Sequence, residues 1–137
     1  MAILPTPTNP TIQVDFLTGS DMANVTLTVN LGFFPLDFQF IEVEGSVWGL
    51  DGGFNGGDDS LLLFPKQTFL PPTLPTNFNS PGIVTFSGVV PRAWLDEDNG
   101  RDEIYSRFDI VGRPNNSVNN ITGVITSPVL RGEFGID

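Results

Sequence analysis

The chain contains no cysteine and no histidine among its 137 residues. Without cysteine it can form no disulfide, no thiolate metal site and no cysteine nucleophile. Without histidine it lacks a Ser-His-Asp triad, His-ligated zinc and the commonest general base near neutral pH. These two absences remove most routes to hydrolysis and acyl transfer, so we expect a protein that is not an enzyme.

Positive charge is also scarce, because six Lys and Arg stand against sixteen Asp and Glu and the formal net charge is −10. Phosphate backbones and anionic lipid headgroups would repel such a chain, so nucleic acid is not an expected partner. No run of about 18 apolar residues is present, and we expect no transmembrane segment. We therefore expect a soluble protein. The N-terminal residues lack the features of a secretory signal, and the compartment stays open.

Helix formers are few, with one Lys and three Ala, whereas Val, Ile and Thr are abundant and 15 Gly and 12 Pro interrupt the chain. This composition favours strands joined by turns. The length is typical of one domain. Residues 1–13 are rich in Pro and Thr and predict an extended N-terminal segment, which leaves residues 14–137 as a single β-sandwich domain.

Apolar side chains alternate with polar ones in several segments, as expected of half-buried strands. The clearest alternation covers residues 24–31 and 104–111. Residues 37–48 change phase, which predicts a bulge near Phe40–Ile41. The apolar run 61–64 predicts a short central strand covered on both faces. Further strands are expected at 83–90, 118–126 and 129–134, the last at a sheet edge, with an irregular surface connection at 67–81.

About seven or eight strands at short spacing predict an all-β fold, an antiparallel β-sandwich, rather than βαβ units. Twelve Phe and two Trp supply large apolar area for its core. Trp48 and Trp94 each precede an acid-rich segment by a few residues. We expect both indole rings to be mostly buried and to lie near these segments.

Half of the sixteen acids fall within residues 51–59 and 96–103. The first segment has four glycines beside its acids, so its backbone can curl and bring carboxylates and carbonyls together. In the second, Asp96 and Asp98 share a face, and a turn through Asn99–Gly100 would return the chain towards them. The candidate metal ligands are Asp51, Asp58, Asp59, Asp96, Asp98 and Asp102.

Carboxylates held this close repel one another by about 1–4 kcal/mol per pair, and a hard cation removes that repulsion. Calcium accepts 6–8 oxygen ligands in a flexible geometry, which suits loops rich in Gly, Asp and Asn better than the strict octahedron of magnesium. Calcium is therefore the expected cofactor. The alternative is that these segments are ordinary solvated turns, because Asp, Asn and Gly are common turn residues.

The segment Leu95–Ile104, with sequence LDEDNGRDEI, resembles the third calcium loop of C2 domains, where a strand ends in Asp-x-Asp and a further Asp precedes an apolar residue. The segment 48–59 is similar, more loosely, to the first calcium loop of that family. The resemblance implies a β-sandwich that binds calcium between two loops. The ligands that it implies are Asp51, Asp58, Asp96, Asp98 and Asp102.

We therefore expect a calcium-binding β-sandwich module whose loop end binds a protein, a carbohydrate or a lipid headgroup, with calcium supplying the positive charge. The alternative is a structural or interaction domain without metal, in which the Pro-rich N-terminal segment, exposed strand edges or loops support assembly into an oligomer. A glycosidase that uses two of the carboxylates is a third interpretation. It is disfavoured because these acids lie in turns without an obvious substrate groove.

Overall fold

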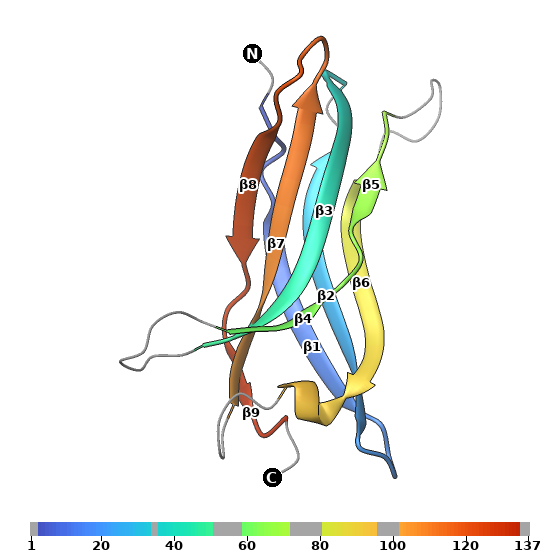
Figure 1. Cartoon of the computed structure of the whole chain (residues 1–137), viewed down its shortest axis with the longest axis vertical. Helices are drawn as coiled ribbons and strands as arrows, with labels where there is room; N and C mark the ends of the chain where they lie inside the picture. Colours follow the sequence, from blue (N-terminus) through green and yellow to red (C-terminus); the bar gives the residue numbers. More distant parts are fainter. Residues whose placement is uncertain (1–2, 34–35, 51–58, 72–80, 96–101, 135–137) are drawn as a thin grey trace.

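The computed structural model describes residues 3–33, 36–50, 59–71, 81–95 and 102–134 (Figure 1). Among these residues there is no α-helix, and a single 3-10 turn, η1 (Arg92–Leu95), follows the sixth strand. The nine strands are β1 (Thr8–Phe16), β2 (Met22–Phe33), β3 (Phe38–Gly49), β4 (Asp59–Leu63), β5 (Gln67–Phe69), β6 (Pro81–Pro91), β7 (Asp102–Pro114), β8 (Ile121–Thr126) and β9 (Leu130–Gly132). The predicted all-β sandwich is confirmed, with nine strands rather than seven or eight.

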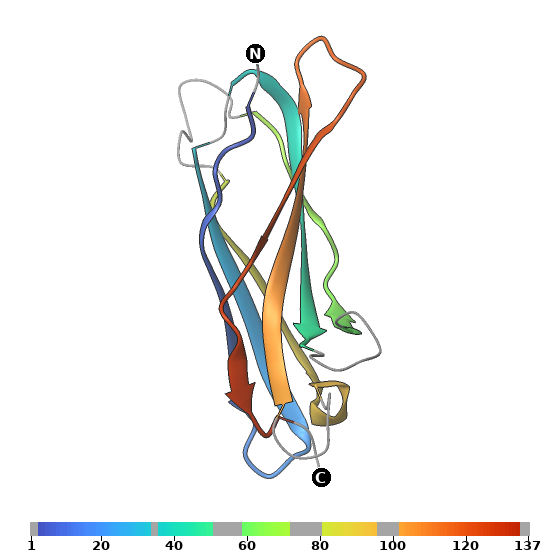
Figure 2. The same cartoon turned by 90° about the vertical axis from the view of Figure 1, so that its left-hand side faces the viewer.

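The strands form two antiparallel sheets that pack face to face. The smaller sheet has the order β1-β2-β6, and the larger has the order β4-β3-β7-β8, with β5 beside β3 and β9 beside β7. Figure 2 shows the two layers, with β1 and β2 on one side and β3 and β7 on the other. The long strands β3 and β7 form the middle of the larger sheet, so the ends of these two strands determine which loops meet.

Each edge of the larger sheet consists of two short strands rather than one long strand. β4 and β5 pair with successive parts of β3, and β8 and β9 pair with successive parts of β7. Pro65 lies between β4 and β5, and Pro128 lies between β8 and β9. Because proline has no backbone N–H, it cannot continue a ladder, and each edge is interrupted there.

The prediction of a central strand at 61–64 is wrong. β4 pairs with β3 only and lies at the sheet edge, and Leu63 is 60% exposed. Only Phe64, just beyond the strand, is fully inside the sandwich. A continuous apolar run shows that both faces of a segment are apolar, but it does not show which strands lie beside it.

The predicted connection at 67–81 is also corrected, because β5 forms inside it and pairs with Ile41–Val43. Three residues are too few for periodicity to indicate a strand. Residues 72–80 lie outside the described part of the chain. The segment does lead from one sheet to the other, as expected, because β5 belongs to the larger sheet and β6 to the smaller.

The other strands match the predictions closely. Residues 24–31 and 83–90 lie within β2 and β6, and 104–111 lie within β7. β8 begins at Ile121, three residues later than expected from the start at 118, and β9 lies at a sheet edge as expected. The first strand, β1, starts at Thr8, inside the segment 1–13.

The predicted phase change in β3 is present, but it lies slightly earlier than expected. The register with β7 shifts between Phe38 and Phe40, so Phe38 is buried on the same face as Ile41 and Val43. One extra residue in a strand moves the following side chains to the opposite face. Phe40 therefore lies on the outer face, where the Arg113 guanidinium is 5.3 Å from its ring centre.

Three phenylalanine rings connect the two sheets through the core. Phe86 of β6, in the smaller sheet, contacts both Phe64, which follows β4, and Phe108 of β7 in the larger sheet. The ring centres of Phe64 and Phe86 are 6.0 Å apart, and those of Phe86 and Phe108 are 6.2 Å apart. A Cβ on Gly45 would lie 2.7 Å from the Phe86 ring, so a glycine at this position lets the ring approach the β3 backbone. Burying each such ring stabilises the fold by about 1.5–3 kcal/mol.

The prediction that both tryptophans are mostly buried is wrong for Trp94, which is 53% exposed. After Pro91 the chain leaves the strand and enters η1, so the alternation of β6 does not extend to Trp94. Trp48 is half-buried on the outer face of β3 and donates its indole N–H to Ser46 Oγ at 2.8 Å. Its neighbour Val47 takes the inward position instead.

Candidate functional site

Two of the six candidate ligands, Asp59 and Asp102, lie in the described part of the chain. Asp59 is the first residue of β4 and Asp102 is the first residue of β7. The remaining candidates, Asp51, Asp58, Asp96 and Asp98, lie outside the described residues.

The strand ends that flank the two acid-rich segments meet at one end of the larger sheet (Figure 1). Gly49, the last residue of β3, pairs with Asp59 on one side and with Ile104 on the other. The backbone N–H of Leu50 also donates to the Glu103 carbonyl at 2.7 Å. The chain therefore leaves β3, enters β4 and enters β7 at neighbouring points.

Asp102 is fully buried at this end of the sheet. Its Oδ2 atom accepts a hydrogen bond from the backbone N–H of Phe134 at 3.1 Å. A buried carboxylate needs such donors, because burying an unsatisfied charge is costly. Asp102 therefore has a structural partner in residues 133–134, called here the C-terminal segment. The side chain of Asp59, by contrast, is exposed to solvent.

Arg92 in η1 binds the same C-terminal segment. Its Nε donates to the Phe134 carbonyl at 3.0 Å, and its Nη2 donates to the Glu133 carbonyl at 3.3 Å. The guanidinium also lies 4.0 Å from the ring centre of Phe16, whose ring meets that of Phe134 edge-on at 6.4 Å. Arg92 lies before the acid-rich segment 96–103 and Asp102 lies near its end, so residues 133–134 bind the chain at both places.

Within the described ranges, no group of three or more acidic side chains is close enough to hold a metal ion. Asp59 and Asp102 reach the same end of the sheet, and the third described acid there, Glu103, pairs with Arg131. Because the chain has no cysteine and no histidine, the candidate ligands are carboxylates, and oxygen donors suit calcium or magnesium rather than a softer metal.

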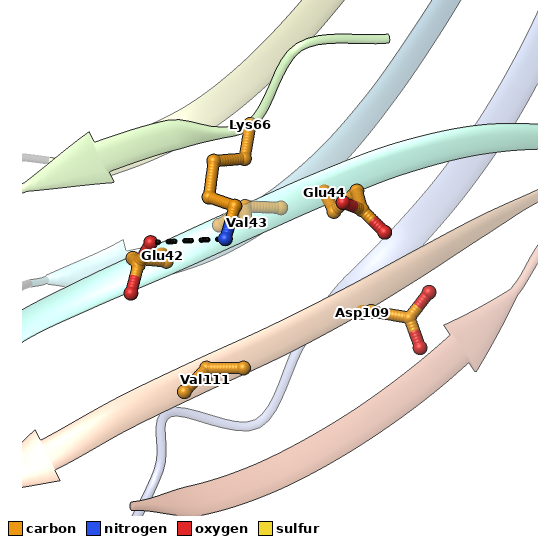
Figure 3. A pocket seen from close by; sticks show the side chains of 6 residues that line it. All are labelled: Glu42, Val43, Glu44, Lys66, Asp109 and Val111. Atoms are coloured by element: carbon orange, nitrogen blue, oxygen red, sulfur yellow. Dashed lines mark ion pairs between the residues drawn. The ribbon is translucent and has the colours of Figure 1, made fainter. Parts of the chain in front are cut away.

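A second group of charged residues lies on the outer face of the larger sheet, around a pocket of about 160 Å³ (Figure 3). Glu42 and Glu44 extend from β3, and Asp109 extends from β7, directly opposite Glu44 in the register. Lys66 Nζ is 3.5 Å from Glu42 Oε2. Arg107 Nη2 is 3.0 Å from Asp109 Oδ1.

Sequence reasoning did not find this outer group. The spacing of Glu42 and Glu44 indicates that they share one face of a strand. The pairing of β3 with β7 then adds Asp109, and a single sequence does not reveal which strands pair. Like charges placed opposite each other on neighbouring strands are destabilising, and the two ion pairs offset part of that repulsion.

The fold makes this protein an antiparallel β-sandwich. No protein-family model matches the chain, and no curated protein sequence matches it. In the part of the chain that the structure describes, no helix is long and apolar enough to cross a membrane.

Proposed function

We propose that this protein is a calcium-binding β-sandwich module that binds a ligand or partner through its acidic end. One observation supports the proposal most directly: Gly49 pairs with both Asp59 and Ile104. Both acid-rich segments of the sequence are thereby connected to the same end of one sheet.

The charge of the chain supports a cation at this end. The net charge is −10, and half of the acids belong to the two segments that these strand ends flank. A bound calcium ion would neutralise part of this charge and would present a positive centre to an anionic group. The partner would then be a protein, a carbohydrate or a lipid headgroup that carries oxygen ligands of its own.

Thermal unfolding in calcium and in chelator tests the proposal. A ligand that binds only the native state stabilises it by RT ln(1 + [L]/Kd), about 2.7 kcal/mol at a hundredfold excess over Kd. We expect calcium to raise the Tm of the wild type. In Asp98→Asn the calcium-induced rise should shrink, while in chelator the Tm should rise slightly because one charge of a like-charged cluster is removed.

Asp15→Asn is the matched control, because Asp15 is an exposed acid on β1, outside both segments. It should keep the full calcium-induced rise in Tm. If the wild type shows no change in Tm between calcium and chelator, the calcium proposal is wrong.

A metal-free interaction domain is the second candidate, and an apolar surface at the edge of the larger sheet favours it. The residues 60–63 of β4 and Trp94 of η1 line a shallow surface pocket. Leu63 and Trp94 are 60% and 53% exposed. Light scattering of the wild type and of Trp94→Ser tests this candidate, since a complex formed through this surface should weaken in the variant.

A further inference from the structure

An apolar pocket of about 450 Å³ lies between the N-terminal segment and β8. The segment 3–7, before β1, forms one wall. Ile110 of β7 and residues 121–124 of β8 form the other. The first described residues and β8 lie on the same side of the molecule in Figure 1. Ile110 lies near the C-terminal end of β7, far along the strand from Asp102, so this pocket is separate from the acidic end.

Two glycines next to the pocket already accommodate an aliphatic side chain. A Cβ on Gly112 would lie 2.6 Å from Leu4 Cδ2, and a Cβ on Gly123 would lie 3.6 Å from Leu4 Cδ1. These glycines belong to the neighbouring strands β7 and β8, where Gly112 pairs with Ile121 and Gly123 with Ile110. The space that they leave holds the Leu4 side chain against the core.

The chemistry of the lining indicates the kind of ligand. None of the ten lining residues is charged or aromatic, although the whole chain carries a net charge of −10 and twelve Phe. A site without rings offers no stacking surface, and a site without charge offers no partner for an ion. Thr6 and Thr122 supply the only side-chain hydroxyls of the lining. The volume lies within the range of about 300–1,000 Å³ that is usual for small-molecule sites.

Part of the apolar lining is in contact with water. Ile3 is 75% exposed and Val124 is 55% exposed. Covering such surface with an alkyl chain is favourable in proportion to the apolar area removed from water. We propose that this pocket binds a neutral aliphatic chain, such as the alkyl part of a fatty alcohol, with its hydroxyl at the threonine side chains. None of the lining residues is a candidate calcium ligand, so this site does not depend on the proposed function.

Calorimetric titration with 1-octanol tests the proposal, with sodium octanoate as the charged comparison. We expect saturable binding of one octanol per chain and weaker binding of octanoate, because the lining offers its carboxylate no cation. Gly123→Val should weaken octanol binding at least about tenfold, because its side chain occupies the pocket and its Cβ makes an ordinary contact with Leu4. Thr126→Val is the matched control, since it adds the same side chain to an exposed position on β8 outside the lining.

Ile3→Ser provides a second test if Gly123→Val does not fold, because Ile3 is exposed and its replacement leaves the core intact. Octanol binding should weaken severalfold in this variant. The proposal is overturned if the wild type shows no saturable binding of octanol, or if the pocket variants bind it as the wild type does. A concentration-dependent dimer that Gly123→Val abolishes and octanol leaves intact would also overturn it, since a second copy would then be the occupant.

Discussion

Asp59 and Asp102 occupy similar places in the sequence and different places in the molecule. Each is the first residue of a strand and lies at or near the end of an acid-rich segment, and both strands reach the end of β3. Asp59 is exposed, whereas Asp102 is fully buried and accepts the Phe134 N–H. Asp102 is in phase with the buried Ile104 and Phe108 of β7, whereas Asp59 begins the edge strand β4. Asp102 therefore stabilises the fold, whereas the exposed carboxylate of Asp59 can reach a ligand in solution.

The largest expected effect separates the two acids in the absence of metal. In chelator, Asp102→Ala should lower the free energy of unfolding by about 1–3 kcal/mol, because the buried Phe134 N–H loses its acceptor. Asp59→Ala should change it by less than about 0.5 kcal/mol, as is usual for an exposed side chain. Urea unfolding of both variants measures the difference. Equal effects would show that the buried hydrogen bond contributes nothing specific.

The next effect concerns the arginines that hold the C-terminal segment. Arg92→Ala should lower the free energy of unfolding by about 1–2 kcal/mol, because it removes two hydrogen bonds and a cation–π contact with Phe16. Arg131→Ala removes the ion pair of Arg131 with Glu103, in which the Arg131 side chain is 56% exposed. It should lower the free energy of unfolding by at most about 1 kcal/mol. Urea unfolding of both variants checks the order, and a larger loss for Arg131→Ala would contradict the proposed anchoring by Arg92.

Melting temperatures in calcium also distinguish Asp59 from Asp102. Asp59→Asn should leave the Tm in chelator unchanged and reduce the rise in Tm that calcium causes in the wild type, because one exposed oxygen ligand loses its charge. Asp102→Asn should already be less stable in chelator. Melting curves in both conditions separate the two roles. A full calcium response in Asp59→Asn would remove Asp59 from the ligand set.

The smallest effect is spectroscopic and concerns the two tryptophans that precede the acid-rich segments. Trp94 is 53% exposed, whereas Trp48 is half-buried with the Arg107 guanidinium 5.2 Å from its ring centre. Trp94→Phe should shift the fluorescence emission maximum to shorter wavelength, because the remaining indole is less exposed to water. Trp48→Phe should shift it to longer wavelength. Identical shifts in the two variants would contradict these exposures.

Period-2 alternation predicted the strands β2, β6 and β7 well, since most of their inward positions carry apolar side chains. It also contained a signal for Asp102 that the sequence reasoning did not use. Asp102 is in phase with Ile104 and Phe108, which are buried. Extending the alternation back by one step places this acid inside, against the usual preference of aspartate for the surface.

What the sequence could not reveal depends on contacts between distant segments. The edge position of β4, the strand β5 and the opposition of Glu44 and Asp109 all follow from which strands pair. Alternation describes the two faces of a strand and carries no information about its neighbours. The meeting of the strand ends at Gly49 is of the same kind, so it too required the structure.

The prolines at the sheet edges have a consequence for the behaviour of the protein at high concentration. An exposed edge strand offers a row of unpaired N–H and C=O groups to which another chain can add, and long flat edges favour fibril growth. In the larger sheet, Pro65 and Pro128 divide both edges, and no edge strand there is longer than the six residues of β8. Addition of further strands is therefore disfavoured at both edges of this sheet.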